Sequence, residues 1–85
     1  MRELEEGELW VTISDLSLSS GKHRSRLEVP RGEVFLVTWI QPDEEAPTPW
    51  LRSAVISLPS GNLTVSLTQL KRAASSRAIV PVEWV

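Results

Sequence analysis

Few side chains in this sequence are of the types that carry out catalysis, and none forms a recognisable nucleophile–base pair. His23 is the single histidine, and general acid–base catalysis usually needs a second titratable group beside it. The absence of cysteine excludes thiol nucleophiles, thiolate metal sites and disulfides. The acidic run 43–45 could hold a hard cation, but such a loop without other fixed ligands is usually solvated. We therefore expect a protein that is not an enzyme and has no metal or cofactor.

The charged residues are segregated along the chain, and basic ones gather in one predicted loop. The net charge is −2, but acidic residues crowd positions 3–8 and 43–45. Outside residues 1–8 and 43–45, the chain has eight basic and four acidic side chains. Lys22, His23, Arg24, Arg26 and Arg31 lie in or beside the loop at residues 19–25 and in the turn that follows. Such a surface steers encounters with acidic partners.

Four tryptophans are a large number for 85 residues, and their positions differ in how easily they can be buried. Trp39 lies in an apolar strand, and we expect it in the core. Trp50 follows a proline-rich loop and Trp84 stands next to the last residue, so both are harder to bury. Exposed tryptophan is a frequent interface anchor. Trp50 therefore joins the five residues of the basic loop as a predicted partner-binding residue.

The most favoured function is a protein-interaction module, a small regulator or adaptor that binds an acidic protein through the basic loop. The first alternative is a nucleic-acid-binding barrel, because basic loops of small barrels can neutralise phosphates. The net charge of −2 is far from the strongly basic profile of a dedicated nucleic-acid binder. The second alternative is a structural subunit of a homo-oligomer that assembles through edge strands.

Period-two hydrophobicity predicts a mainly all-β fold of five or six short strands, an antiparallel barrel or sandwich. Residues 9–18 change apolar phase once, which indicates either a bulge or two strands separated at Ser14 and Asp15. A short strand at 26–29 meets a tight turn at 30–33, where Pro30 and Gly32 suit the geometry. Residues 34–40 are apolar on both faces, which is typical of a central strand covered on both sides.

The second half of the chain contains the strongest hairpin signal. Strands at 51–58 and 63–67 flank a turn at 59–62, with Leu63 and Val65 inward and Thr64 outward. Residues 68–78 fit a short helix or 3₁₀ turn, with Thr68 as a candidate N-cap. Pro81 confines the last strand to a sheet edge. We expect one domain over residues 8–85, after a flexible segment at 1–7.

No signal peptide is visible at the N-terminus, and no apolar run approaches the roughly 20 residues that cross a bilayer. The sequence therefore favours a cytoplasmic protein with no membrane partner.

The stretch LEVPRGEVFLV at residues 27–37 resembles the diverging turn of SH3 domains. The likeness covers residues 8–84: the loop at 41–49 stands where the n-Src loop would, Trp50 where the binding-groove tryptophan opens the next strand, 59–62 where the distal loop lies, and 68–78 where the late 3₁₀ turn lies. The resemblance implies an SH3-like barrel that binds proline-rich ligands. The chain departs from the family because it has no tyrosine for the groove and a basic loop where the RT loop is acidic.

Overall fold

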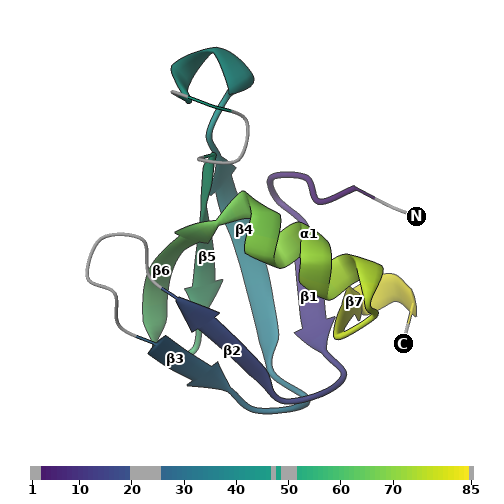
Figure 1. Cartoon of the computed structure of the whole chain (residues 1–85). Helices are drawn as coiled ribbons and strands as arrows, with labels where there is room; N and C mark the ends of the chain where they lie inside the picture. Colours follow the sequence, from purple (N-terminus) through teal and green to yellow (C-terminus); the bar gives the residue numbers. More distant parts are fainter. Residues whose placement is uncertain (1–2, 20–25, 47, 49–51, 85) are drawn as a thin grey trace.

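The computed structural model describes residues 3–19, 26–46, 48 and 52–84, and its regular structure is mostly β-strand (Figure 1). The elements are β1 (Leu9–Thr12), β2 (Leu16–Ser19), β3 (Arg26–Val29), β4 (Val34–Ile40), η1 (Asp43–Glu45), β5 (Ser53–Leu58), β6 (Gly61–Ser66), α1 (Leu67–Ser75), β7 (Ile79–Pro81) and η3 (Val82–Trp84). The mainly β prediction is confirmed, with seven strands in place of five or six. The phase change of the first segment reflects two strands, β1 and β2, separated at Ser14 and Asp15.

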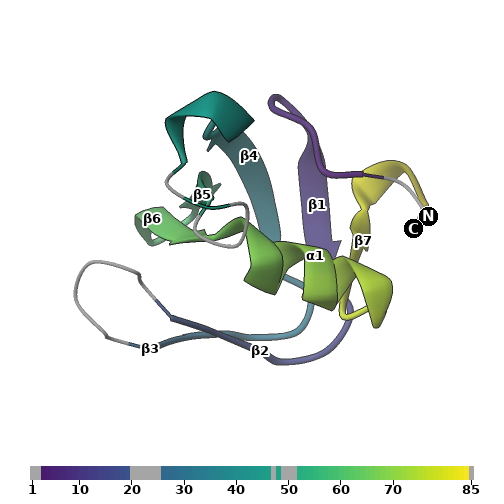
Figure 2. The same cartoon turned by 45° about the horizontal axis from the view of Figure 1, so that its top comes forward.

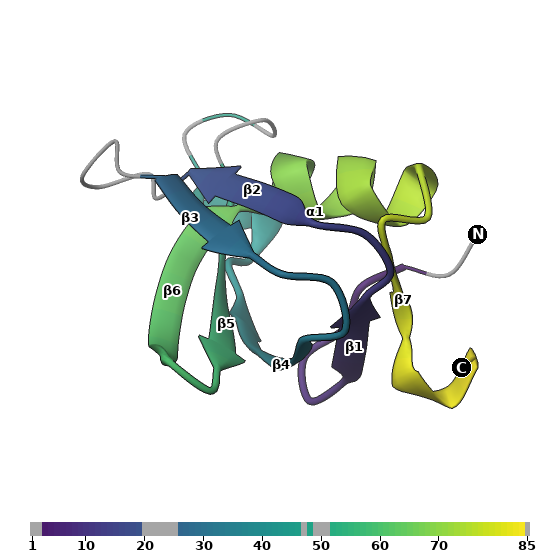
Figure 3. The same cartoon turned by 90° about the horizontal axis from the view of Figure 1, so that it is seen from below.

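Five strands form one antiparallel sheet in the order β6-β5-β4-β1-β7, and β2 pairs with β3 in a separate hairpin. Figure 3 shows that this hairpin and α1 lie on the same side of the five-stranded sheet. The core fills the space between them: Trp10, Phe35 and Ile56 come from the sheet, Leu18 from the hairpin and Leu70 from α1. The sheet therefore has one face turned to the core and one turned away from it.

Thr12 holds the turn that was predicted at residues 30–33. Its buried hydroxyl donates to the Pro30 carbonyl at 2.7 Å and accepts the Glu33 N–H at 2.9 Å. Gly32 adopts φ 86°, and its N–H donates to the Thr12 carbonyl oxygen at 2.8 Å. These bonds join β1 to the start of β4 and satisfy polar groups that the core would otherwise leave unpaired.

The β5–β6 hairpin confirms the strongest sequence signal. Leu58 pairs with Gly61, which adopts φ 131°, a conformation that a side chain rarely allows. Leu63 and Val65 face the core as predicted, and Thr64 faces away from it. Local turn residues and alternation are sufficient to fix this register.

The predicted helix is also confirmed, as α1. It begins at Leu67 with Ser66 in the N-cap position, two residues earlier than the Thr68 cap expected from the sequence. Leu67, Leu70 and Ala73 are buried against the core, which is the spacing of one helical face.

The prediction for β4 is only half right. The strand is central in the sheet, but it is not covered on both sides, because Val34 is 43% exposed. Trp39 is 39% exposed, so its assignment to the core is wrong. The reason is a bulge at Thr38: Val37 pairs with Ile56 and Trp39 with the next residue, Val55, so one extra residue turns Trp39 outward.

Part of the N-terminal segment that was expected to be flexible lies against the domain. Leu4 is buried among the core residues, and the Gly7 N–H donates to the Val37 carbonyl oxygen at 2.7 Å. Residues 4–7 therefore belong to the folded unit.

Candidate functional site

The structure describes only two of the six predicted partner-binding residues. Arg26 and Arg31 are exposed, at the start of β3 and in the turn after it. An extended chain rises about 3.3 Å per residue, so their backbones lie at most about 16 Å apart, Arg26 at the start of β3 and Arg31 two residues beyond its end. Lys22, His23, Arg24 and Trp50 lie outside the described residues. The two described arginines alone do not form a common site.

The acidic run 43–45 forms the 3₁₀ turn η1, which stands apart from α1 and β7 in Figure 1. Asp43 pairs with Arg52 at 3.0 Å. Across the described part of the chain, no three acidic, histidine or cysteine side chains converge as metal ligands. The helix found within the described ranges is also too short to span a membrane.

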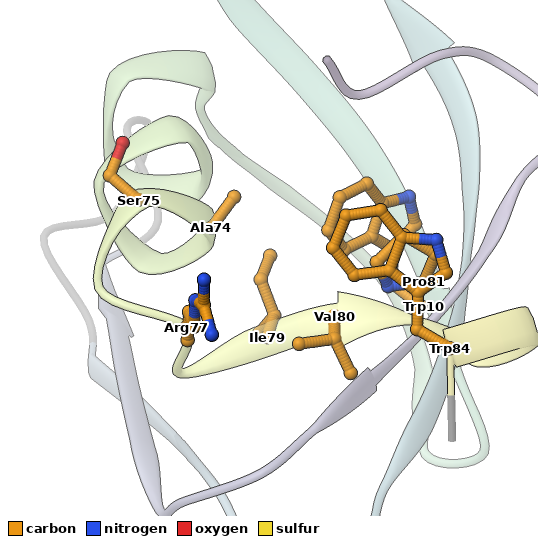
Figure 4. A pocket seen from close by; sticks show the side chains of 8 residues that line it. All are labelled: Trp10, Ala74, Ser75, Arg77, Ile79, Val80, Pro81 and Trp84. Carbon is orange, nitrogen blue, oxygen red and sulfur yellow. The ribbon is translucent and has the colours of Figure 1, made fainter. Parts of the chain in front are cut away.

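A groove runs along β7 at the edge of the five-stranded sheet, and we call it the β7 groove. It encloses about 320 Å³ between the end of α1, the strand and η3. Figure 2 shows β7 beside β1, with the C-terminal end of α1 next to it. The lining residues are Trp10, Ala74, Ser75, Arg77, Ile79, Val80, Pro81 and Trp84. Figure 4 shows Arg77 at one end and Pro81, Trp10 and Trp84 at the other.

Two tryptophans form the apolar end of the β7 groove. Trp10 is 1% exposed and belongs to the core, whereas Trp84 on η3 is 59% exposed. The Trp10 indole N–H is buried and has no hydrogen-bond partner among the described residues. An aromatic side chain as exposed as Trp84, beside a groove and on the turn that follows an edge strand, is typical of an interface anchor.

Arg77 supplies the only charge among the described residues that line the groove. It has φ 60°, a left-handed conformation that is uncommon for a residue with a side chain. The Ala78 N–H donates to the Ala73 carbonyl at 2.8 Å and the Arg77 N–H to the Ala74 carbonyl at 3.1 Å. These bonds form a Schellman motif, in which glycine usually takes the position of Arg77. Within the described chain, the Arg77 guanidinium makes no ion pair.

On the side of β7 away from β1, the described part of the chain places no further strand of the sheet. Thr12 of β1 bonds to Glu33, before β4, whereas the next residue, Ile13, donates to the Ala78 carbonyl at 2.8 Å. In an antiparallel pair of strands, hydrogen-bonded residue pairs alternate with pairs that share no hydrogen bond. Ile13 is bonded to Ala78, so the next pair, Thr12 with Ile79, is not bonded, and neither is Trp10 with Pro81. The N–H and C=O of Ile79 and the C=O of Pro81 therefore point away from β1. Pro81 has no N–H to donate, and at this outward position no ladder bond is lost.

The sequence indicated part of this site and missed the rest. Pro81 correctly placed the last strand at an edge, and Trp84 was expected to be hard to bury. Arg77 was not singled out, because nothing in the sequence marks a left-handed arginine where glycine is usual. Trp10 lines the groove because β1 pairs with β7, and no local sequence pattern specifies that pairing.

Comparisons of the chain with protein-family models, with curated proteins and with solved structures found no significant match.

Proposed function

We propose that this chain is a non-catalytic protein-interaction module, a small regulator or adaptor, that binds an extended acidic segment of a partner protein in the β7 groove. The observation that carries the proposal is the meeting of a free strand edge, an exposed tryptophan and an unpaired arginine in one groove. Protein-binding sites with these parts recognise a peptide by its backbone, one anchor side chain and one charge.

The extended form of the ligand follows from β7. A peptide strand laid beside β7 can donate to the Ile79 and Pro81 carbonyl oxygens and accept the Ile79 N–H. Addition of a strand to an exposed sheet edge gives affinity through main-chain hydrogen bonds, while side-chain pockets give specificity. β7 has only three residues, so the backbone contribution is short and the side chains must supply much of the selectivity.

The acidic character of the ligand follows from Arg77. A carboxylate on the peptide can accept a charge-assisted, bidentate pair of hydrogen bonds from its guanidinium. At the other end, Trp84 and Pro81 offer apolar surface to one large side chain. The expected ligand is thus an extended segment with an acidic residue and an apolar residue a few positions apart.

An SH3-like relationship remains part of the proposal. The turn at 30–33, the β5–β6 hairpin and α1 follow one another in the order of that family's diverging turn, distal loop and late 3₁₀ turn, but α1 is a nine-residue α-helix where the family has a 3₁₀ turn. Binding in the β7 groove would differ from the proline-rich recognition of that family. Arg26, Arg31 and the basic loop remain predicted as a further contact for an acidic partner.

A selection with a phage-displayed library of random dodecapeptides tests the proposed function. Selected peptides should be enriched in an acidic residue and a large apolar residue, and should bind Arg77→Glu at least about 10-fold more weakly, the cost of one charged hydrogen bond. Lys71→Glu is the matched control, because this exposed residue on α1 does not line the groove. Binding that is equally weakened by both variants, or unchanged by Arg77→Glu, would contradict the proposal.

A further inference from the structure

The face of the sheet turned away from the core carries a patch of apolar side chains, which we call the apolar face. It consists of Leu9, Val11, Val34, Leu36, Trp39 and Val80, on strands β7, β1 and β4. Leu9 is 50% exposed, and Val34 and Trp39 are also exposed. Figure 3 shows α1 and the β2–β3 hairpin on the other side of the sheet, so neither covers this face.

These side chains form one continuous surface. Leu9 pairs with Leu36, while Val11 pairs with Val34 on one side and with Val80 on the other. Side chains of directly paired residues lie about 5 Å apart on the same face of a sheet. Val11 is nearly covered although it is not part of the core, because its neighbours on this face surround it.

Beyond Val55, which pairs with Trp39 at the margin of the apolar face, the remainder of the same face is polar. The other outward positions of β5 and β6 include Ser57, Asn62 and Thr64, the pattern of a strand pair that faces water. The pattern of β4 differs, since it is apolar on both faces, which is typical of a strand covered on both sides. The contrast within one sheet indicates that the apolar half is covered when the protein functions.

The size and charge of the apolar face identify the occupant that fits it best. Three strands spaced about 4.8 Å apart, with side chains over five residues of β4, give a footprint of roughly 240 Å². A standard stable interface buries about 800 Å² on each partner, so the contact should be weak. The described residues of the patch include no charged side chain, so two copies related by a two-fold axis would bring no like charges together.

We propose that two copies of this chain pair through their apolar faces to form a weak, symmetric dimer with a dissociation constant in the micromolar to submillimolar range. The interface is a face of the sheet and leaves the strand edges free. Figure 4 shows Val80 pointing away from α1, opposite to Ile79. Val80 also lines the β7 groove, so the dimer contact and the groove meet at this residue, while Arg77 and Trp84 lie outside the dimer contact. The dimer would present two grooves, which raises the apparent affinity for a partner with two binding segments.

Sedimentation velocity between about 5 µM and 1 mM tests this proposal. The wild-type chain should shift from monomer to dimer over this range, and Val34→Lys should remain monomeric because it places two like charges across the two-fold axis. Thr64→Lys is the matched control on the polar half of the same sheet face and should dimerise as the wild type does. Circular dichroism and thermal unfolding confirm that each variant folds, and Leu9→Gln replaces Val34→Lys if that variant does not.

Three results would overturn the dimer. They are a wild-type chain that stays monomeric at 1 mM, a folded Val34→Lys or Leu9→Gln variant that dimerises normally, and a Thr64→Lys variant that is equally impaired. Peptide binding by the monomeric variant separates this proposal from the function of the groove, since the selected dodecapeptides should still bind it with single-site affinity.

Discussion

Replacement of Arg77 should separate the stability of the domain from its binding activity. A residue with a side chain in the left-handed region costs about 1–2 kcal/mol relative to its ordinary conformation. Glycine removes that cost but gains about 0.4–1 kcal/mol of conformational freedom in the unfolded chain. Arg77→Gly should therefore be more stable than Arg77→Ala by about 1 kcal/mol, because alanine keeps the strain and both variants lose the guanidinium.

Urea and thermal unfolding measure this difference. For a domain of this size, 1 kcal/mol corresponds to a change in melting temperature of about 4–8 °C. Both variants should lose affinity for the selected acidic peptides to a similar extent, about 10-fold or more. If Arg77→Gly is more stable than Arg77→Ala and neither variant binds the peptide, the strained Arg77 serves recognition and not stability.

Two results would refute this reasoning. Equal stability of Arg77→Gly and Arg77→Ala would mean that the backbone at this position stores no strain. Wild-type peptide affinity in either variant would mean that the guanidinium does not contact the ligand.

Three further substitutions test the fold that positions the groove, each by urea denaturation. Thr12→Val should destabilise the domain by about 2–3 kcal/mol, because it leaves the Pro30 carbonyl and the Glu33 N–H without their partner; a loss below 0.5 kcal/mol would show that water replaces the hydroxyl. Gly61→Ala should cost about 1–3 kcal/mol through its φ of 131°, and an unchanged midpoint would contradict a strained turn. Asp43→Asn should change stability by less than about 1 kcal/mol, since the Asp43 side chain is 77% exposed in its pair with Arg52, and a larger loss would indicate a structural role for η1.

Much of the fold could be predicted because its signals are local. The turn at 30–33 and the hairpin around Gly61 carry residues that suit a narrow range of backbone angles, and alternation then fixes the register. The helix followed from the spacing of Leu70, Ala73, Ala74 and Ala78, although its exact start did not. Pro81 marked an edge strand because it cannot donate to a ladder.

The errors came from features that depend on tertiary pairing. The bulge at Thr38 moves the Trp39 side chain from the core face of the sheet to the other face. Neither threonine nor tryptophan at these positions predicts a bulge. The apolar character of Val34 and Leu36 predicted a covered strand, but it could not show which element covers it. These two errors together concealed the apolar face.

The candidate site was harder to predict than the fold. A basic cluster is easy to see in a sequence, but Arg26 lies at the start of β3 and Arg31 two residues beyond its end. The β7 groove instead combines residues from β1, the end of α1, β7 and η3. Trp10 and Arg77 are far apart in the sequence, and only the pairing of β1 with β7 brings their surroundings together.

Amide hydrogen exchange of Ile79, measured by NMR with and without a selected acidic peptide, tests the central claim most directly. The Ile79 N–H points away from β1 although Ile79 is buried, so its exchange should slow further when a peptide strand pairs with it. Shifts of the Trp84 indole resonance should accompany that protection. Peptide binding that leaves the Ile79 amide and the Trp84 indole unchanged, and perturbs Arg26 and Arg31 in their place, would contradict binding in the groove.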